Sequence, residues 1–458
     1  MPEHETNTQT VGQKSHSFPP GLHNAFLFAA FNALSFQIVL SSPMVLYAKT
    51  LGVSATVLGI IAGMMPLLVM FQIPAANYIN RVGYKRFVLA GWTTRVMFIF
   101  GMALVPLTGV FLDTGARLAL MLLLLFGFNL SRGISSCAWL PWISTLVPPT
   151  VRGKYLSRDA GVTNLASFVA FLIAAACLSG ASRAWQFALL FAFSAVMGAA
   201  SLIFLKRIPD AEISEQVRTS TTRVPWLEMV RHPPFRKLLR TVVAWSVAYG
   251  GMTTFTVAFL KTEAGMSEGR ILAVTSTAFL GGWSSLWFLG SRLDRLGSKP
   301  VLSFSFAAWL AVLAGWISLA GGVFLPQLAN VLALQFLMGL LAALVSMSNT
   351  RLAMAIIPTM GRNHFFAIYS VVANVTLGLV PIAWGLLIDA VGARQSVWLG
   401  LSWNRYTVFF AGAALAFLVT LFLARRLDEP EAASMEELLR EILVQSPQRF
   451  WLRFWPRG

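Results

Sequence analysis

The chain has 458 residues, of which 57% are hydrophobic and only 12% are charged. This composition lies outside the usual range of soluble globular proteins and indicates a protein embedded in a membrane. The formal net charge of +17 would also fit a protein that binds nucleic acid, but the Lys and Arg residues gather in short loops between apolar stretches. Such grouping is typical of membrane proteins, so no nucleic-acid partner is expected.

Twelve stretches are long and apolar enough to cross a bilayer, which takes about 20 residues in a helix. The polar residues 1–22 precede them, without the basic flank, short apolar core and cleavage site of a signal peptide. We therefore expect the first span to remain in the mature chain. The predicted spans cover residues 23–47, 54–79, 87–111, 116–146, 160–180, 184–205, 237–260, 270–290, 300–321, 325–357, 364–388 and 405–424. The expected fold class is an all-α membrane protein with twelve transmembrane helices.

Basic residues are unequally divided between two sets of loops. The loops after even-numbered spans hold eighteen Lys and Arg residues, whereas those after odd-numbered spans hold seven. Because Lys and Arg concentrate on the cytoplasmic side, both termini are predicted to face the cytoplasm of a bacterial inner membrane. The expected parts are a cytoplasmic tail (1–22), a six-helix bundle (23–205), a cytoplasmic central loop (206–236), a second six-helix bundle (237–424) and a cytoplasmic amphipathic tail (425–458).

Three short stretches occur twice, at offsets of 213, 214 and 210 residues. YAKTLGVS, ending at Ser54, has the counterpart AFLKTEAGMS, ending at Ser267. ANYINRVGYKR has the counterpart GSRLDRLGSKP, and PPTVRGKYL with Arg152 has the counterpart PTMGRNHFF with Arg362. A nearly constant offset indicates a fused duplication. Because each half holds an even number of spans, the second half repeats the first in the same orientation, as a parallel repeat.

The stretch GSRLDRLGSKP resembles the loop signature of the major facilitator superfamily, G-x-x-x-D-R-x-G-x-K/R, which lies between helices 2 and 3 and again between helices 8 and 9. The first copy departs from it, with Ala76 in place of the glycine and Asn80 in place of the aspartate. The resemblance implies two bundles that rock about a site between them, giving alternating access. Its conformational-switch residues would be Asn80, Arg81, Gly83 and Lys85 in the first copy and Gly290, Asp294, Arg295, Gly297 and Lys299 in the second.

The basic turn also has a physical interpretation of its own. Gly83 and Gly297 permit the backbone angles of a tight helix reversal, and Arg295 and Lys299 lie where anionic lipid headgroups attract them. Asp294 could bind the positive end of a neighbouring helix in one conformation and release it in another. The alternative is a tight basic turn that is set by topology alone.

The family resemblance implies a path lined mainly by helices 1, 4, 7 and 10, with help from helices 2, 5, 8 and 11. Polar and aromatic residues at the middle depth of these helices are therefore the candidates for binding a small-molecule solute. An amide can instead bond to a neighbouring helix, and an aromatic residue can serve packing alone. The candidates are Asn32, Gln37, Asn129, Arg132, Trp245, Tyr249, Gln335 and Asn374.

Arg132 is predicted to lie about 20 Å from either end of its helix, too deep to reach the surface easily, so it should face the bundle interior or a wet cavity. The family's helix 4 signature, R-x-x-x-G, would place the arginine at Asn129 relative to Gly133. Two partners remain open for Arg132: an anionic solute, or water and backbone carbonyls. Arg95 and Arg351, which are nearer to helix ends, are expected to reach the cytoplasmic surface.

All eighteen Asp and Glu residues fall in tails, loops or predicted helix ends. Since a proton-coupled carrier normally needs a titratable group within the membrane, facilitated diffusion, exchange or coupling through the substrate itself is favoured. The alternative is a proton-coupled symporter or exporter of a neutral solute such as a sugar or drug. No catalytic, cofactor or metal motif is evident, and the two cysteines suit packing. A monomeric transporter, not an enzyme, is the expected function. A membrane enzyme or sensor on a transporter scaffold is the alternative from another class.

Overall fold

The structure, a computed structural model, describes residues 20–147, 152–180, 182–211, 230–289, 297–356, 362–398, 400–427 and 429. Most of the predicted tails and central loop lies outside these residues, as do Gly290, Asp294 and Arg295 of the second basic turn. Eleven helices of the described part, some of them broken into pieces, are long and apolar enough to cross a membrane. Helix α14 (Glu268–Leu289) occupies the remaining predicted span. The expected fold of twelve transmembrane helices is confirmed.

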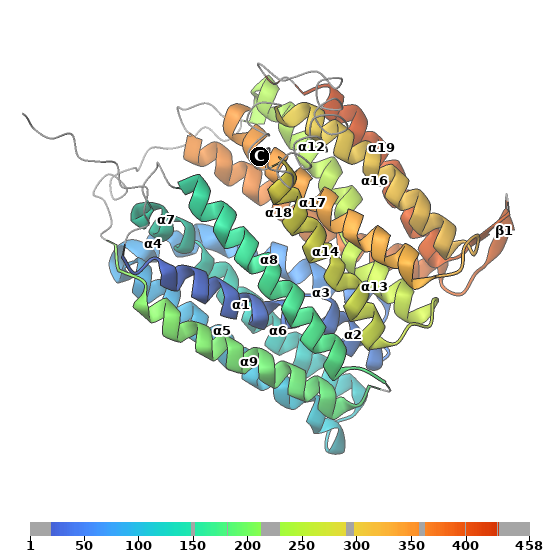
Figure 1. Ribbon diagram of the computed structural model, residues 1–458, viewed down its shortest axis with the longest axis horizontal. Coiled ribbons are helices and arrows are strands. Elements are labelled where there is room, and N and C mark those ends of the chain that lie inside the picture. The colour runs from blue at the N-terminus through green and yellow to red at the C-terminus, as the bar shows by residue number, and fades with distance from the viewer. Residues whose placement is uncertain are drawn as a thin grey trace, which may run out of the picture.

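The first half of the chain forms one bundle, drawn in blue to green in Figure 1. Its first, second and fourth spans are broken helices, whereas its fifth and sixth are continuous. The elements are α1 (His23–Leu40), α2 (Ser42–Thr50), α3 (Ala55–Leu68), η1 (Val69–Phe71), α4 (Gln72–Val82), α5 (Tyr84–Leu104), η2 (Val105–Val110), α6 (Thr114–Ser136), α7 (Trp139–Leu146), α8 (Arg152–Cys177) and α9 (Ala184–Arg207).

The second half forms the other bundle, drawn in yellow-green to red in Figure 1. Its first span breaks at Gly250 and Gly251, close to the position equivalent to the break at Ser41 in the first half. The elements are α12 (Pro233–Tyr249), α13 (Met252–Thr262), α14, α16 (Ser298–Ala320), α17 (Leu328–Ile356), α18 (Arg362–Val391), β1 (Ser396–Trp398), β2 (Leu401–Trp403) and α19 (Arg405–Arg425).

The two ends of the bundles are distinguished by what lies there. We call the end at which α1 and α12 begin and α9 ends the linker end. The opposite end carries the antiparallel hairpin of β1 and β2 and is called the hairpin end (Figure 1).

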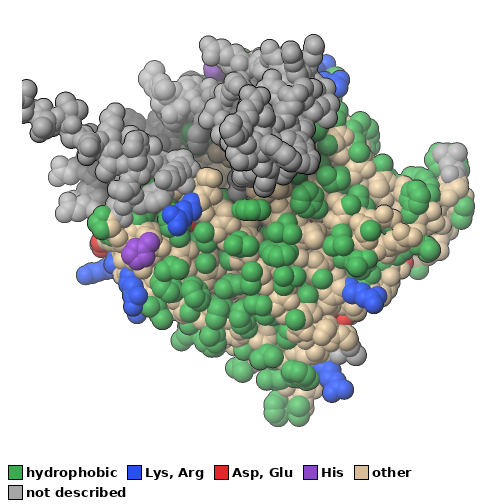
Figure 2. All heavy atoms as spheres, in the orientation of Figure 1, with side chains coloured by type: hydrophobic (Ala, Val, Ile, Leu, Met, Phe, Trp, Pro, Cys, Tyr) green, Lys and Arg blue, Asp and Glu red, His purple; other side chains and the backbone are tan. Residues whose placement is uncertain are grey.

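On the face seen in Figure 2, hydrophobic side chains cover the middle, and Lys and Arg side chains lie toward the borders. This distribution fits a molecule whose middle is surrounded by lipid.

Several helices that start at the hairpin end begin at a capping side chain, which satisfies backbone N–H groups that have no partner inside the helix. Ser54 Oγ accepts a hydrogen bond from Val57 N at 3.3 Å at the start of α3. Asp113 accepts one from Gly115 N at 3.0 Å at the start of α6. These residues were outside or at the edges of the predicted spans because polar caps end the apolar runs.

The two halves meet closely near the hairpin end, where α3 packs along α18, α8 along α14 and α2 against α13. A Cβ atom at Gly59 would lie 2.3 Å from the carbonyl oxygen of Pro381, and one at Gly63 would lie 2.2 Å from that of Gly378. Backbones can approach so closely only where side chains are absent. The contact therefore closes the hairpin end of the interface between the halves.

Each of the two basic turns contains a glycine that directly precedes the next helix. Gly83 precedes α5 with φ +88°, and Gly297 precedes α16 with φ +84°. Residues with side chains rarely adopt this region. The two glycines of the duplicated turn therefore supply the positive φ angle at which the chain reverses before the next helix.

At the linker end, a carboxylate beyond α19 binds the start of α16. Glu429 accepts hydrogen bonds from Ser298 N at 2.8 Å and Lys299 N at 2.6 Å. It also forms an ion pair with Arg351 Nη1 at 3.1 Å. Arg351 keeps 30% of its side chain exposed, so this arginine lies near the surface at the linker end and ties α17 to α16 and α19.

The expectation that Arg95 reaches the membrane surface is wrong. Arg95 is only 4% exposed, and its guanidinium carbon lies 4.4 Å from the centre of the Trp92 ring and 5.2 Å from that of Phe128. Cation–π contacts of this kind stabilise a desolvated guanidinium. Arg95 therefore belongs to the interior of the first bundle.

Candidate functional site

A cavity of about 240 Å³ lies between the two halves at the middle of the bundles. We call it the central cavity. Its lining comes from α1, α2 and α8 of the first half and from α12, α13, α14 and α17 of the second. The lining residues are Gln37, Ser41, Ser42, Asn164, Phe171, Tyr249, Thr253, Thr275, Ala278, Phe279, Gly282, Gln335, Met338, Gly339 and Ala343. None of them is charged.

The helix breaks in the first span of each half position part of this lining. Ser41 and Ser42 lie where α1 gives way to α2, and Tyr249 and Thr253 flank the glycines between α12 and α13. Chain breaks at membrane depth are tolerated where the backbone faces protein or a cavity. The duplicated architecture thus brings two equivalent breaks to one cavity.

Two amide side chains of the cavity are held by hydrogen bonds, one to a neighbouring helix and one within its own helix. Gln37 Nε2 donates to Ser167 Oγ at 3.1 Å, and Asn164 Nδ2 donates to Ala160 O at 2.9 Å. Gln335 is only 3% exposed. A primary amide has two donor hydrogens and an acceptor oxygen, so these residues keep hydrogen-bonding capacity for a bound molecule.

Aromatic rings form the other walls of the central cavity. Phe171 of the first half and Phe279 of the second meet edge to face, with ring centroids 5.0 Å apart. Tyr249 stacks on Trp245, with centroids 4.7 Å apart and planes 10° apart. Trp245 does not line the cavity. It packs against Trp309 and other rings of the second half, so it supports the ring of Tyr249 from behind.

A second cavity of about 430 Å³ lies nearer the linker end, between α18 and the helices α3, α4 and α7. Ser370 and Asn374 line it, together with Gln72, Cys137 and mainly apolar residues. Asn374 Nδ2 donates to Ser370 O at 2.8 Å within α18. This candidate therefore belongs to the second cavity and is separate from the central one.

Arg132 is partly buried on α6. Within the described part of the chain it makes no hydrogen bond or ion pair, and the positive charge of Arg95 acts on it. Asn129 on the same helix is 1% exposed and donates to Leu125 O at 2.9 Å. Its Oδ1 atom has no hydrogen-bond partner in the described part. The helix 4 candidates thus lie in the interior but do not line the central cavity.

Of the eight candidates, the structure brings Gln37, Tyr249 and Gln335 together in one cavity. Asn32, Asn129, Arg132, Trp245 and Asn374 lie elsewhere. Sequence reasoning missed Asn164 and Thr275 in particular. Asn164 is an amide at middle depth on helix 5, so the criterion that selected Gln37 would have found it.

The expectation about acidic residues needs one correction. Helix α8 begins at Arg152 rather than near residue 160, and its apolar span begins at Tyr155. Asp159 therefore lies one helical turn inside the span, partly buried, and its Oδ1 atom has no hydrogen-bond partner in the described part. Hydropathy placed the boundary too late because Arg158 and Asp159 interrupt the apolar run.

Comparison with known structures supports the same architecture. A mutant of the nucleoside transporter NupG matches with a TM-score of 0.68 at 12% identity, over 89% of this chain and 100% of that one. A D-xylose-proton symporter matches with a TM-score of 0.68 at 15% identity, over 90% and 100% of the two chains. The peptide transporter POT in complex with sulfate gives 0.63 at 15% identity, over 89% and 95%. Comparison with curated proteins finds no match.

A family model described as the Major Facilitator Superfamily matches residues 25–290 and 260–456. These two segments together span nearly the whole chain, and the second begins near the start of the sequence repeat. The twelve helices, the duplicated turn and the cavity between the halves agree with this match. The chain therefore belongs to the Major Facilitator Superfamily.

Proposed function

We propose that the protein moves a small neutral solute rich in hydroxyl groups across the membrane by alternating access, and that the linker end faces the cytoplasm. The observation that carries this proposal is the central cavity, to which both halves contribute and whose lining, among the described residues, holds no charged side chain. The close packing of α3 on α18 closes the path toward the hairpin end. Rocking of the halves would open it there.

The chemistry of the lining supports the neutral class. Amides and hydroxyls from Gln37, Asn164, Thr253 and Gln335 can donate to and accept from hydroxyl groups, and Tyr249 offers an apolar ring face. A volume near 240 Å³ falls below the range of about 300–1,000 Å³ that is typical of sites for drug-sized ligands. Two structural neighbours are a nucleoside transporter and a D-xylose-proton symporter, and nucleosides and D-xylose are solutes of this class.

Uptake of labelled monosaccharides, nucleosides and dicarboxylates into proteoliposomes tests the proposal. We expect uptake of a neutral solute, recovered chemically unchanged, and its loss in Gln37→Leu and Gln335→Leu. Gln327→Leu is the matched control, because Gln327 is exposed directly before α17, outside the cavity. Uptake of the dicarboxylates alone would refute the neutral solute class. Chemical conversion of a solute without its net uptake would refute transport.

A second candidate is an organic anion, and one observation favours it. Arg132 is a partly buried guanidinium with no hydrogen-bond or ion-pair partner among the described residues, and a carboxylate or phosphate can bind such a group with two parallel hydrogen bonds. The variant Arg132→Gln separates this candidate from the neutral one.

A further inference from the structure

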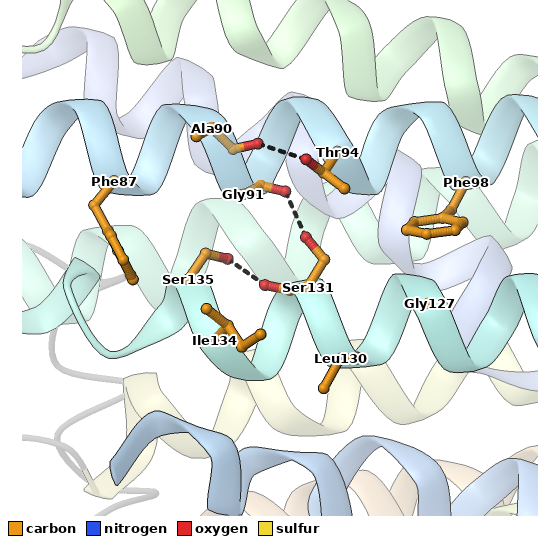
Figure 3. A pocket seen from close by; sticks show the side chains of 10 residues that line it. All are labelled: Phe87, Ala90, Gly91, Thr94, Phe98, Gly127, Leu130, Ser131, Ile134 and Ser135. Atoms are coloured by element: carbon orange, nitrogen blue, oxygen red, sulfur yellow. Dashed lines mark hydrogen bonds between the residues drawn. The ribbon is translucent and has the colours of Figure 1, made fainter. Parts of the chain in front are cut away.

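A separate groove of about 360 Å³ runs along the flank of the first bundle, between α5 and α6. Figure 3 shows Phe87 and Phe98 toward its two ends on α5, with Ser131 and Ser135 of α6 between them. Ala90 and Thr94 are exposed on this flank. The groove therefore opens outward, toward the lipid that surrounds a protein of this family, and is distinct from both cavities between the halves.

The hydroxyl groups of the groove are all used by the two helices themselves. Thr94 Oγ1 donates to Ala90 O at 3.0 Å, and Ser131 Oγ donates across the helices to Gly91 O at 3.0 Å. Ser135 Oγ donates to Ser131 O at 2.8 Å. The groove consequently presents carbon atoms and no free hydroxyl hydrogen. Its chemistry suits a hydrocarbon chain rather than a polar ligand.

The groove also has the length of one half of a bilayer. It extends over the twelve residues from Phe87 to Phe98, whose end-to-end rise corresponds to about 16 Å along a helix. The hydrocarbon core of a bilayer is about 30 Å thick, so each leaflet contributes about half of that. Because α5 begins at the linker end, the groove spans the leaflet on that side.

Positive charge lies at the linker end of the groove. Arg86 is exposed and precedes Ala90 by one helical turn and Thr94 by two, so the three residues share one face of α5. Lys85 is its neighbour in the chain. An arginine at this level can bind a phosphate by paired hydrogen bonds. It therefore complements the headgroup of a lipid whose chain occupies the groove.

From this charge, length and apolar lining, we propose that the groove between α5 and α6 binds an anionic phospholipid of the leaflet at the linker end. One acyl chain occupies the space between Phe87 and Phe98, and the phosphate headgroup binds Arg86. The proposal depends on the membrane setting of the chain but not on which solute is transported.

Native mass spectrometry of the purified full-length chain tests the site, using titration with phosphatidylglycerol and with phosphatidylcholine of the same acyl chains. One basic residue near a membrane surface contributes about 1 kcal/mol, or roughly fivefold in affinity. We expect wild type to prefer phosphatidylglycerol and Arg86→Gln to lose that preference. Arg207→Gln, which removes an exposed basic residue at the linker end of α9, should retain it.

Filling the groove tests the chain-binding part. Thr94→Phe should reduce binding of both lipids by about tenfold, which corresponds to 1.4 kcal/mol. Thr93→Phe is the matched control, because Thr93 is also exposed and donates to Leu89 O at 2.8 Å but does not line the groove. Ala90→Leu provides a smaller filling change if Thr94→Phe does not fold.

Three outcomes would overturn the proposal. Lipid binding by the filled variants equal to wild type would exclude the groove. Equal affinity of wild type for the two lipids would exclude recognition of the anionic headgroup at Arg86. A dimer that Thr94→Phe converts to a monomer would show that a second copy of the chain, not a lipid, occupies the groove.

Discussion

The carboxylate of Asp389, near the hairpin end of α18, accepts hydrogen bonds from Thr56 N at 2.8 Å and from Thr56 Oγ1 at 2.6 Å. A third hydrogen bond comes from Ala55 N at 2.9 Å. A side chain of the second half therefore caps the first turn of α3 in the first half. Free N–H groups and the helix dipole both favour a negative charge at that position. The contact therefore stabilises the closed packing of the two halves at the hairpin end.

We expect Asp389→Asn to weaken this contact between the halves and shift the protein toward a state that is open at the hairpin end. The amide carries no charge, and hydrogen bonds to charged groups are worth about 1.5–3 kcal/mol, so a shift of roughly tenfold in the equilibrium is expected. Labelling of single cysteines introduced near the central cavity, with a reagent confined to either side of the membrane, measures the change.

Asp113→Asn is the control for the Asp389 variant. Asp113 caps α6 by accepting a hydrogen bond from Gly115 N at 3.0 Å, at the same end of the molecule but within one half. Asp113→Asn should lower the stability of helix α6 and leave the labelling of the introduced cysteines unchanged. If both variants label like wild type, Asp389 does not hold the halves together.

Glu429→Gln should destabilise the linker end of the second half. Its side chain is only 3% exposed and binds two backbone N–H groups at the start of α16 as well as Arg351. Loss of the charge should lower the free energy of unfolding by about 2 kcal/mol, measured by thermal unfolding in detergent. The more exposed pair of Glu263 and Arg405 provides the control, and Glu263→Gln should cost less. An equal cost would contradict the capping role.

The spans and the turns could be predicted because their signals are local. Long apolar runs interrupted by basic turns indicate membrane helices whatever their neighbours are, and Gly83 and Gly297 stand where only a residue without a side chain turns easily. Depth within a span, together with the path-lining helices that the family resemblance implies, predicts Gln37, Tyr249 and Gln335 as site residues.

The remaining site positions depend on which face of each helix points toward the cavity. A single sequence does not specify that rotation. Asn129 lies at the right depth, yet its amide bonds to Leu125 of its own helix. The shallow depth of Arg95 predicts a position at the surface, but the rings of Trp92 and Phe128 bind it inside. Thr275 lines the central cavity, although its hydroxyl donates a hydrogen bond to Ile271 O. From the sequence, such a threonine looks the same as one that only packs within a helix.

Asp159 is the residue at which we expect a proton to bind if transport is driven by a proton gradient. It lies inside the membrane span of α8 with one carboxylate oxygen unpaired in the described part, and carboxyl groups within the membrane commonly serve proton transfer. Asp159→Asn should abolish stimulation of uptake by an imposed proton gradient and preserve exchange of solute. Asp210→Asn, which changes an exposed carboxylate at the linker end, should keep the stimulation. Full stimulation in Asp159→Asn would exclude this role.

Arg132→Gln decides between an anionic and a neutral solute. A guanidinium at middle depth costs at least about 2.5 kcal/mol on insertion scales, and no carboxylate of the described part pairs with Arg132. If an anion binds there, the variant should lose at least tenfold in affinity, about 1.4 kcal/mol, with expression and melting temperature unchanged. Arg95→Gln, which removes the nearby arginine packed against Trp92 and Phe128, should instead lower stability. Misfolding of the Arg132 variant, or transport of a neutral solute with wild-type affinity, would assign Arg132 to the structure and leave the uncharged central cavity as the site of binding.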